Sequence, residues 1–316
     1  MPCVIDGNPG LRRAVGDLAT RSSRGLQRWR HDGRSLRERA GFPDAGGVLM
    51  PSVIVAGRTV VYSVAGSTSG MPVMFVHGSF GGSSAWRRLI SRLDQAQVRT
   101  ITLDLPGWGS SDAPPDPVVH HQAAAVEAVM KVIGEPVHLI AHSHGGTVAL
   151  MTAISARIPI RSLTLFEPLP LAVLVGRDDL IDQMRTFLKD YRTAWEAGDH
   201  LAVGRVIDLW AGPGTFQAMS TEAREVAAAG TALNIREWQS HFEVQIPLDS
   251  FRALSPPTTI VVTERGHRVA RAMGESLHRL VARSTLIDMP GASHAMIHTH
   301  AADAAKIVGR GVGLQS

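Results

Sequence analysis

The chain alternates short apolar runs with stretches whose apolar residues recur every three or four positions. A continuous apolar run is typical of a buried parallel strand, and the wider spacing predicts an amphipathic helix. The runs expected to form strands are 72–76, 99–104, 137–141, 162–166, 258–263 and 284–288, with helices at 123–133 and 268–282 among those between them. This alternation predicts an α/β domain with a mostly parallel sheet and right-handed crossovers.

Two further strands are expected before this series. Residues 53–55 and 59–64 flank Ala56-Gly57-Arg58, a pattern that predicts an antiparallel hairpin. The predicted sheet therefore has eight strands and is flanked by helices.

The alternation stops between residues 176 and 250. We expect helices near 178–197, 199–210 and 217–242, and nine of the 16 aromatic residues fall between Phe166 and Phe251. An aromatic-rich helical insertion predicts a cap over a pocket, although most of these side chains are expected to fill the cap's own core. We therefore expect residues 50–170 and 251–316 to form the core and 171–250 a cap inserted after the sixth strand.

Positive charge is concentrated near the N-terminus. The chain has 32 Lys and Arg against 28 Asp and Glu; residues 1–49 hold nine Arg and five acidic residues, which leaves 23 of each sign in residues 50–316. The neutral body argues against nucleic-acid binding. We expect residues 1–49 to be mostly disordered. They are interpreted as an inert extension before a start at Met50, with a transit peptide and a basic arm for an acidic partner as alternatives.

Cysteine usage and hydropathy exclude several classes of protein. Cys3 is the only cysteine, which excludes an intrachain disulfide and a zinc–thiolate site. The sequence lacks an apolar run of about 18 residues, so a membrane span is not expected. It also opens without an apolar secretory core, which favours a cytoplasmic location. The oligomeric state does not follow from the sequence.

The most informative stretch runs from Val137 to Leu150. An apolar strand leads into Ala141-His142-Ser143-His144-Gly145, and a helical pattern follows at once. Small residues around Ser143 permit a sharp turn that lifts its hydroxyl to the end of the sheet, with the His144 amide at the start of the helix. Alone, the pattern also fits an ordinary turn with a buried serine.

This stretch resembles the nucleophile elbow of the α/β-hydrolase superfamily, with Ala141 in place of the usual first glycine. Two other stretches resemble the same family: the loop His77-Gly78-Ser79-Phe80-Gly81-Gly82, and His294 on a Gly-Ala-Ser-His turn after the last strand. The resemblance covers residues 52–310. It implies Ser143 as nucleophile, His294 as base, and the backbone amides of Ser79 and His144 as the oxyanion hole, with Phe80 as the neighbouring alternative to Ser79.

The acidic member of the triad departs from the usual pattern. The family most often carries an Asp where this chain has Gly266, after Thr263-Glu264-Arg265. A known variant of the superfamily has the carboxylate after the strand that follows the nucleophile helix. Glu167 lies there and is therefore our candidate, with Glu264 in reserve. The alternative interpretation makes Glu167 a hinge residue of the cap.

The resemblance implies a serine hydrolase without metal or cofactor. We expect a small or medium carboxylic ester with an apolar acyl group as substrate, cleaved through an acyl-enzyme on Ser143. The alternatives are a carbon–carbon bond (diketone) hydrolase or a cofactor-free perhydrolase with the same triad. Two others are a catalytically silent ligand-binding relative and a metal hydrolase built on His294 and His298. A serine at position 143 argues against haloalkane and epoxide chemistry, which would need an aspartate there.

Overall fold

The computed structural model describes residues 50–155 and 157–314. The predictions made for residues 1–49 lie outside the described residues.

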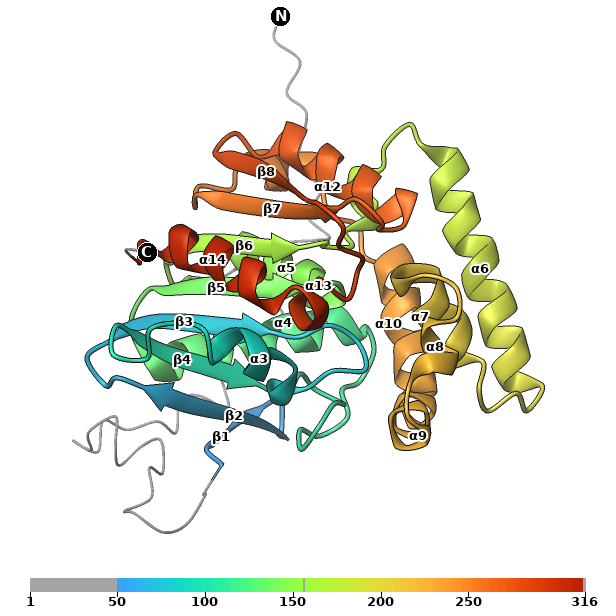
Figure 1. Ribbon diagram of the computed structural model, residues 1–316, viewed down its shortest axis with the longest axis horizontal. Coiled ribbons are helices and arrows are strands. Elements are labelled where there is room, and N and C mark those ends of the chain that lie inside the picture. The colour runs from blue at the N-terminus through green and yellow to red at the C-terminus, as the bar shows by residue number, and fades with distance from the viewer. Residues whose placement is uncertain (1–49, 156, 315–316) are drawn as a thin grey trace, which may run out of the picture.

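The described chain is organised around one twisted sheet of eight strands. Its spatial order is β1-β2-β4-β3-β5-β6-β7-β8, and Figure 1 shows the sheet at the centre of the molecule. The strands are β1 (Ser52–Val55), β2 (Arg58–Gly66), β3 (Met71–Val76), β4 (Val98–Leu103), β5 (Val137–His142), β6 (Ile160–Phe166), β7 (Thr258–Thr263) and β8 (Ser284–Met289). The β1–β2 and β2–β4 pairs are antiparallel and the remaining pairs are parallel. The predicted mostly parallel sheet is confirmed.

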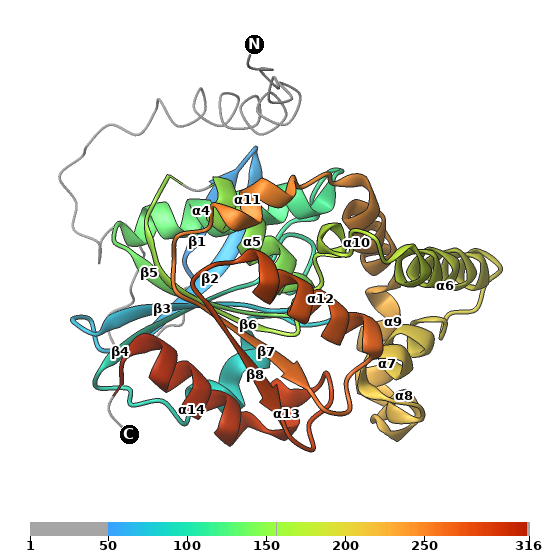
Figure 2. The same cartoon turned by 90° about the horizontal axis from the view of Figure 1, so that it is seen from above.

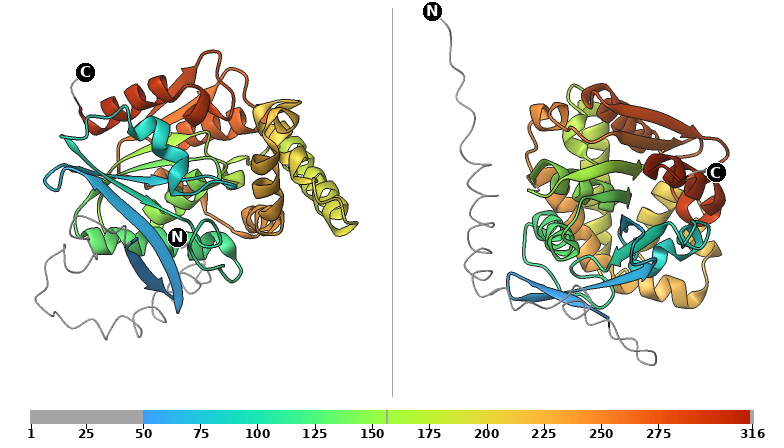
Figure 3. Two further views of the ribbon diagram at one scale, coloured as in Figure 1. Left: turned by 60° about the horizontal axis from the view of Figure 1, so that its bottom comes forward. Right: turned by 90° about the vertical axis from the view of Figure 1, so that its left-hand side faces the viewer.

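Helices cover both faces of this sheet. Figure 2 shows α4 (Val118–Ile133), α5 (His144–Ser155), α11 (Leu248–Arg252) and α12 (Arg268–Leu280) over one face. The opposite face is covered by α13 (Met296–Thr299) and α14 (Ala301–Val312), against which α3 (Arg87–Ile90) packs. Figure 3 shows β1 and β2 at the sheet edge remote from β7 and β8. Every helix in the described ranges is too short or too polar to cross a membrane.

The segment between β6 and β7 is helical, as expected, but more broken than predicted. Its helices before α11 are α6 (Asp178–Glu196), α7 (Val203–Ala211), α8 (Thr215–Ala218), α9 (Thr221–Ala229) and α10 (Thr231–Glu243). The single helix expected at 217–242 is interrupted because the Ser220 side chain caps α9 and Gly230 separates α9 from α10. Figure 1 shows α6–α10 grouped beside the sheet, in the direction in which β6 points. The division of the chain into a core and a cap stays a prediction.

The side chains of each strand point alternately to the two faces of the sheet and fill an apolar layer on each face. In β3, Met74 and Val76 belong to one buried cluster, and Val73 and Phe75 belong to the other. Neighbouring side chains of a strand point to opposite faces, so a fully apolar strand packs on both sides. The sheet is therefore a rigid support for the loops that follow its parallel strands.

Helix α5 packs closely on the end of β3 at Gly145, and this contact leads to a prediction about stability. A Cβ at Gly145 would collide with the His77 carbonyl oxygen and lie 2.6 Å from that of Val76. We expect Gly145→Ala to lower the free energy of unfolding by about 1–3 kcal/mol, measured by urea denaturation. Gly309→Ala on α14 is the matched control, because its new Cβ would have no neighbour closer than 3.9 Å. The control should be neutral or stabilising by about 0.5–1 kcal/mol; equal losses in both variants would contradict this account.

Candidate active site

Ser143 lies on the tight turn between β5 and α5. Its φ is +57°, a left-handed conformation that is unfavourable for a residue with a side chain. Two backbone hydrogen bonds hold the turn: the Ser143 amide donates to the Phe166 carbonyl at 2.9 Å, and the Gly146 amide donates to the Ser143 carbonyl at 2.8 Å. The serine is thereby fixed at the carboxyl end of the sheet.

His294 bridges Ser143 and Glu167. Its Nδ1 is 2.6 Å from Glu167 Oε2 and its Nε2 is 2.8 Å from Ser143 Oγ. A carboxylate oxygen accepts, so Nδ1 carries the proton, and in the neutral ring Nε2 accepts from the serine hydroxyl. All three side chains are buried. The structure thus brings together three residues from the ends of β5, β6 and β8 that are far apart in sequence.

Glu167 is held by the residues around the position where an Asp would be usual. Its side chain is 0% exposed, and its Oε1 accepts hydrogen bonds from the Thr263 amide, at 3.1 Å, and from the Thr263 hydroxyl. A Cβ at Gly266 would collide with this same carboxylate oxygen. The space that a side chain at position 266 would need is therefore filled by Glu167 and by the Thr263 hydroxyl that bonds it. The reserve candidate, Glu264, is exposed and accepts from the Gly291 amide at 2.7 Å instead.

Backbone strain is concentrated around this group. Four described residues other than glycine have positive φ, and three of them are Phe80 (+59°), Ser143 (+57°) and Glu167 (+40°). Such conformations cost roughly 1–3 kcal/mol each and persist where the surrounding structure fixes them. The strained residues therefore lie together at the ends of β3, β5 and β6.

The loop after β3 is held by the buried His77 side chain. The Leu105 amide donates to His77 Nε2 at 2.9 Å, so the proton lies on Nδ1, which donates to the Gly78 carbonyl at 2.7 Å. Ser79 on this loop and His144 at the start of α5 both line the same cavity as Ser143.

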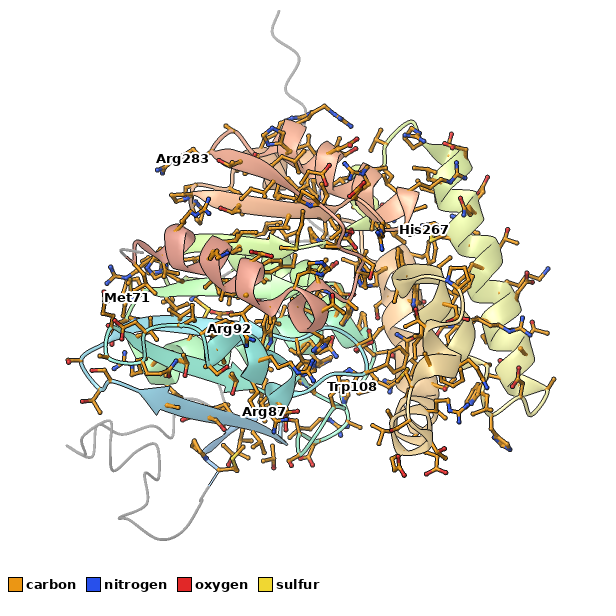
Figure 4. All side chains as sticks on the ribbon, viewed as in Figure 1. Met71, Arg87, Arg92, Trp108, His267 and Arg283 are labelled. Atoms are coloured by element: carbon orange, nitrogen blue, oxygen red, sulfur yellow. The ribbon has the colours of Figure 1, made fainter. Side chains whose placement is uncertain are left out.

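This cavity has a volume of about 720 Å³ and lies between the strand ends and α7, α9 and α10. The Trp210 ring is 5.4 Å from the His294 ring, and Trp238 stacks on Trp210 at 5.6 Å. Figure 4 shows Trp108 and His267 at the border between the sheet and these helices. Aromatic side chains of the insertion thus do line a pocket, whereas Trp195 on α6 is 37% exposed.

A buried carboxylate on α10 was not predicted. Glu237 is 1% exposed, and its Oε2 accepts from the Ser79 hydroxyl at 2.5 Å. Its Oε1 accepts from Trp108 Nε1 at 2.7 Å and from Gln122 Nε2 at 3.0 Å. The available signal was the spacing of Asn234, Glu237 and His241, which repeats at helical intervals on one face of an otherwise partly apolar helix.

The histidines beside Ser143 take part in separate contacts. His142 Nε2 donates to the His294 carbonyl at 2.8 Å, and the two rings lie 4.8 Å apart. His144 Nε2 is 2.5 Å from Gln122 Oε1, and its Nδ1 is 2.8 Å from His241 Nε2. Burial lowers the pKa of His144 and of His241 to about 3, and that of His142 well below 6.5, so these three rings are neutral at pH 7.

A metal site is not apparent around these residues. Within residues 50–155 and 157–314, no group of three or more His, Cys, Asp or Glu side chains is arranged to hold an ion. His294, considered above as a ligand together with His298, has both ring nitrogens engaged by Ser143 and Glu167.

Comparison with known proteins identifies the class. The sequence model described as "Alpha/beta hydrolase family" matches residues 73–307. The chain belongs to this family, in agreement with its eight-stranded sheet. The structure resembles an esterase from Exiguobacterium antarcticum with a TM-score of 0.66 and 18% identity, over 82% of this chain and 97% of that one. At this identity the likeness shows the fold alone.

Curated relatives include methyl ester esterases and hydrolases of 2-hydroxy-6-oxononadienedioate. The pimeloyl-[acyl-carrier protein] methyl ester esterase of Neisseria meningitidis is 28% identical over 72% of this chain and 88% of its own length. A 2-hydroxy-6-oxononadienedioate/2-hydroxy-6-oxononatrienedioate hydrolase of Dechloromonas aromatica is 29% identical over 37% of this chain. The match spans only 47% of that hydrolase, and still less of several other curated relatives.

The Glu237 network predicts a large loss of stability when its carboxylate is removed. Glu237→Leu leaves the buried donors of Trp108 and Gln122 and the partly buried Ser79 hydroxyl without this acceptor, so we expect the free energy of unfolding to fall by about 3 kcal/mol or more. Glu243→Leu, at the exposed end of the same helix, is the control and should change it by about 0.5 kcal/mol or less. Urea denaturation at pH 7 measures both, and similar losses would show that the network does not stabilise the fold.

Proposed function

We propose that this chain is a serine esterase that cleaves a small or medium carboxylic ester through an acyl-enzyme on Ser143. The observation that carries the proposal is the hydrogen-bonded series from Ser143 Oγ to His294 Nε2 and from His294 Nδ1 to Glu167 Oε2, at 2.8 and 2.6 Å. A serine hydroxyl is a weak nucleophile, and an adjacent base that is oriented by a third group activates it.

In the first half-reaction, Ser143 Oγ attacks the ester carbonyl carbon while His294 Nε2 takes the hydroxyl proton. Glu167 holds the imidazole in the required tautomer and stabilises its charged form. The tetrahedral oxyanion accepts hydrogen bonds from the backbone amides of Ser79 and His144. When the intermediate collapses, the C–O bond to the alcohol breaks and His294 gives the proton to the departing oxygen.

Water then hydrolyses the acyl-enzyme by the same steps. His294 removes a proton from water, the hydroxide adds to the acyl carbonyl, and Ser143 leaves with the proton returned by His294. Helices α6–α10 act as the cap, and apolar side chains of α7, α9 and α10 line the cavity beside Ser143. A cavity of about 720 Å³ lined by residues such as Val206, Trp210 and Trp238 suits an apolar acyl group.

The relatives support an ester before other substrates. The methyl ester esterase matches most of this chain and most of its own length, whereas the 2-hydroxy-6-oxononadienedioate hydrolase matches little more than a third of this chain. Hydrolysis of a diketone carbon–carbon bond by the same triad therefore remains the second candidate.

A fluorophosphonate probe tests the nucleophile directly. We expect one probe to attach to Ser143, identified by peptide mass spectrometry, and p-nitrophenyl acetate and butyrate to be hydrolysed with a burst of one p-nitrophenol per active site. Ser143→Ala should lose the label and at least about a thousandfold in kcat/KM. Probe attachment elsewhere, or equal hydrolysis by Ser143→Ala, would refute the proposal.

A further inference from the structure

The cavity beside Ser143 is lined by acidic side chains without a basic one in the described ranges. Of its two acidic side chains, Glu237 is buried and Glu222 is exposed to solvent, and in the described part of the chain neither Lys nor Arg lines it. Its other ionisable residues are histidines, and burial lowers the pKa of His142, His144, His241 and His298 below 6.5. The cavity therefore offers a ligand negative charge without a fixed positive partner.

The hydrogen-bond partners of Gln122, His144 and His241 determine which atoms of the cavity wall are acceptors. Gln122 Nε2 faces both the Pro106 carbonyl and Glu237 Oε1, so the amide nitrogen lies on that side and Gln122 Oε1 faces His144. His144 must then donate from Nε2 and accept at Nδ1, so His241 donates from Nε2. In the neutral His241 ring, Nδ1 is left as an acceptor, and it has no hydrogen-bond partner among the described residues.

Asn234 is a second unsatisfied group on the same helix face. It lines the cavity one helical turn before Glu237 and is 1% exposed, and its Oδ1 lacks a partner among the described residues. A buried polar group without a partner is costly, and a bound ligand with a donor would relieve that cost. Glu237 Oε2 accepts one hydrogen bond, from Ser79, and has a second lone pair available.

We propose that Asn234 and Glu237 on α10 form a subsite for an uncharged substrate that carries a hydroxyl or amide N–H group, and that the same wall excludes substrates with a free carboxylate. This rests on the proposed esterase function for its chemistry and deepens it by naming the substrate class. The donor of the substrate bonds to Asn234 and Glu237, while the ester carbonyl lies at Ser143. A carboxylate in this position would face Glu237 at short range without a cation.

Three ligands that differ only at one end test the subsite by binding. Ethyl hexanoate, ethyl 6-hydroxyhexanoate and ethyl hydrogen adipate are titrated into Ser143→Ala protein at pH 7 and followed by calorimetry. We expect the hydroxy ester to bind about tenfold more tightly than the hexanoate. The adipate should bind at least about tenfold more weakly than the hexanoate. Equal affinities, tightest binding of the adipate, or no detectable binding of the hydroxy ester would overturn the proposal.

Two substitutions and one control, each made in the Ser143→Ala background, show which residues cause these differences in affinity. Asn234→Leu should bring the ratio of hydroxy ester to hexanoate affinity close to one. Glu237→Gln should reduce the discrimination against adipate about tenfold, whereas Glu222→Gln should change it less than twofold, because Glu222 is exposed to solvent. Equal effects of Glu237→Gln and Glu222→Gln would contradict the assignment. If a variant fails to fold, the comparison of the three ligands stands without it.

Turnover by the wild-type protein separates the two proposals. Hydrolysis of ethyl hexanoate without the expected affinity order refutes the subsite alone. The expected affinity order without hydrolysis of any of the three esters refutes the esterase alone.

Discussion

The candidate active site depends most on the buried Glu167 carboxylate and its hydrogen bond to His294. A carboxylate that is fully removed from water needs several donors, and Glu167 has the Thr263 amide, the Thr263 hydroxyl and His294 Nδ1. These partners come from β7 and from the loop after β8, so the bond requires the parallel order β5-β6-β7-β8. The bond in turn orients the imidazole toward Ser143, which makes the sheet and the site mutually dependent.

The glycine at position 266 and the carboxylate at position 167 depend on each other. A side chain at position 266 and a carboxylate from position 167 would compete for the same space beside Thr263. The sequence could suggest that the acid comes from position 167, because the usual Asp is missing at position 266 and Glu167 follows β6. What it could not give is the contact itself, since residues 167 and 266 meet only when β6 and β7 pair.

The sheet, the elbow and the late histidine were predictable because local patterns define them: continuous apolar strands, small residues around Ser143, and the turn before His294. The wall of the cavity was not. Glu237 accepts hydrogen bonds from Ser79, Trp108 and Gln122, which all lie more than 100 residues before it, and such non-local contacts leave only a weak periodic pattern in the sequence of α10. The break at Ser220 and Gly230 has a local origin instead, because a capping side chain and a glycine outweigh a continuous helical pattern.

Moving the carboxylate from position 167 to position 266 tests the proposed triad most directly. Glu167→Gly should fold, because φ at this position is +40° and glycine relieves that strain. We predict that it lowers kcat/KM for p-nitrophenyl butyrate by about a thousandfold or more. Adding Gly266→Asp to Glu167→Gly should restore at least about tenfold, because the Asp side chain enters the space that Glu167 left and the Thr263 hydroxyl, which no longer bonds Glu167, turns aside for its Cβ. The account would be contradicted if Glu167→Gly kept wild-type activity and Glu264→Gln instead lost about a thousandfold in kcat/KM.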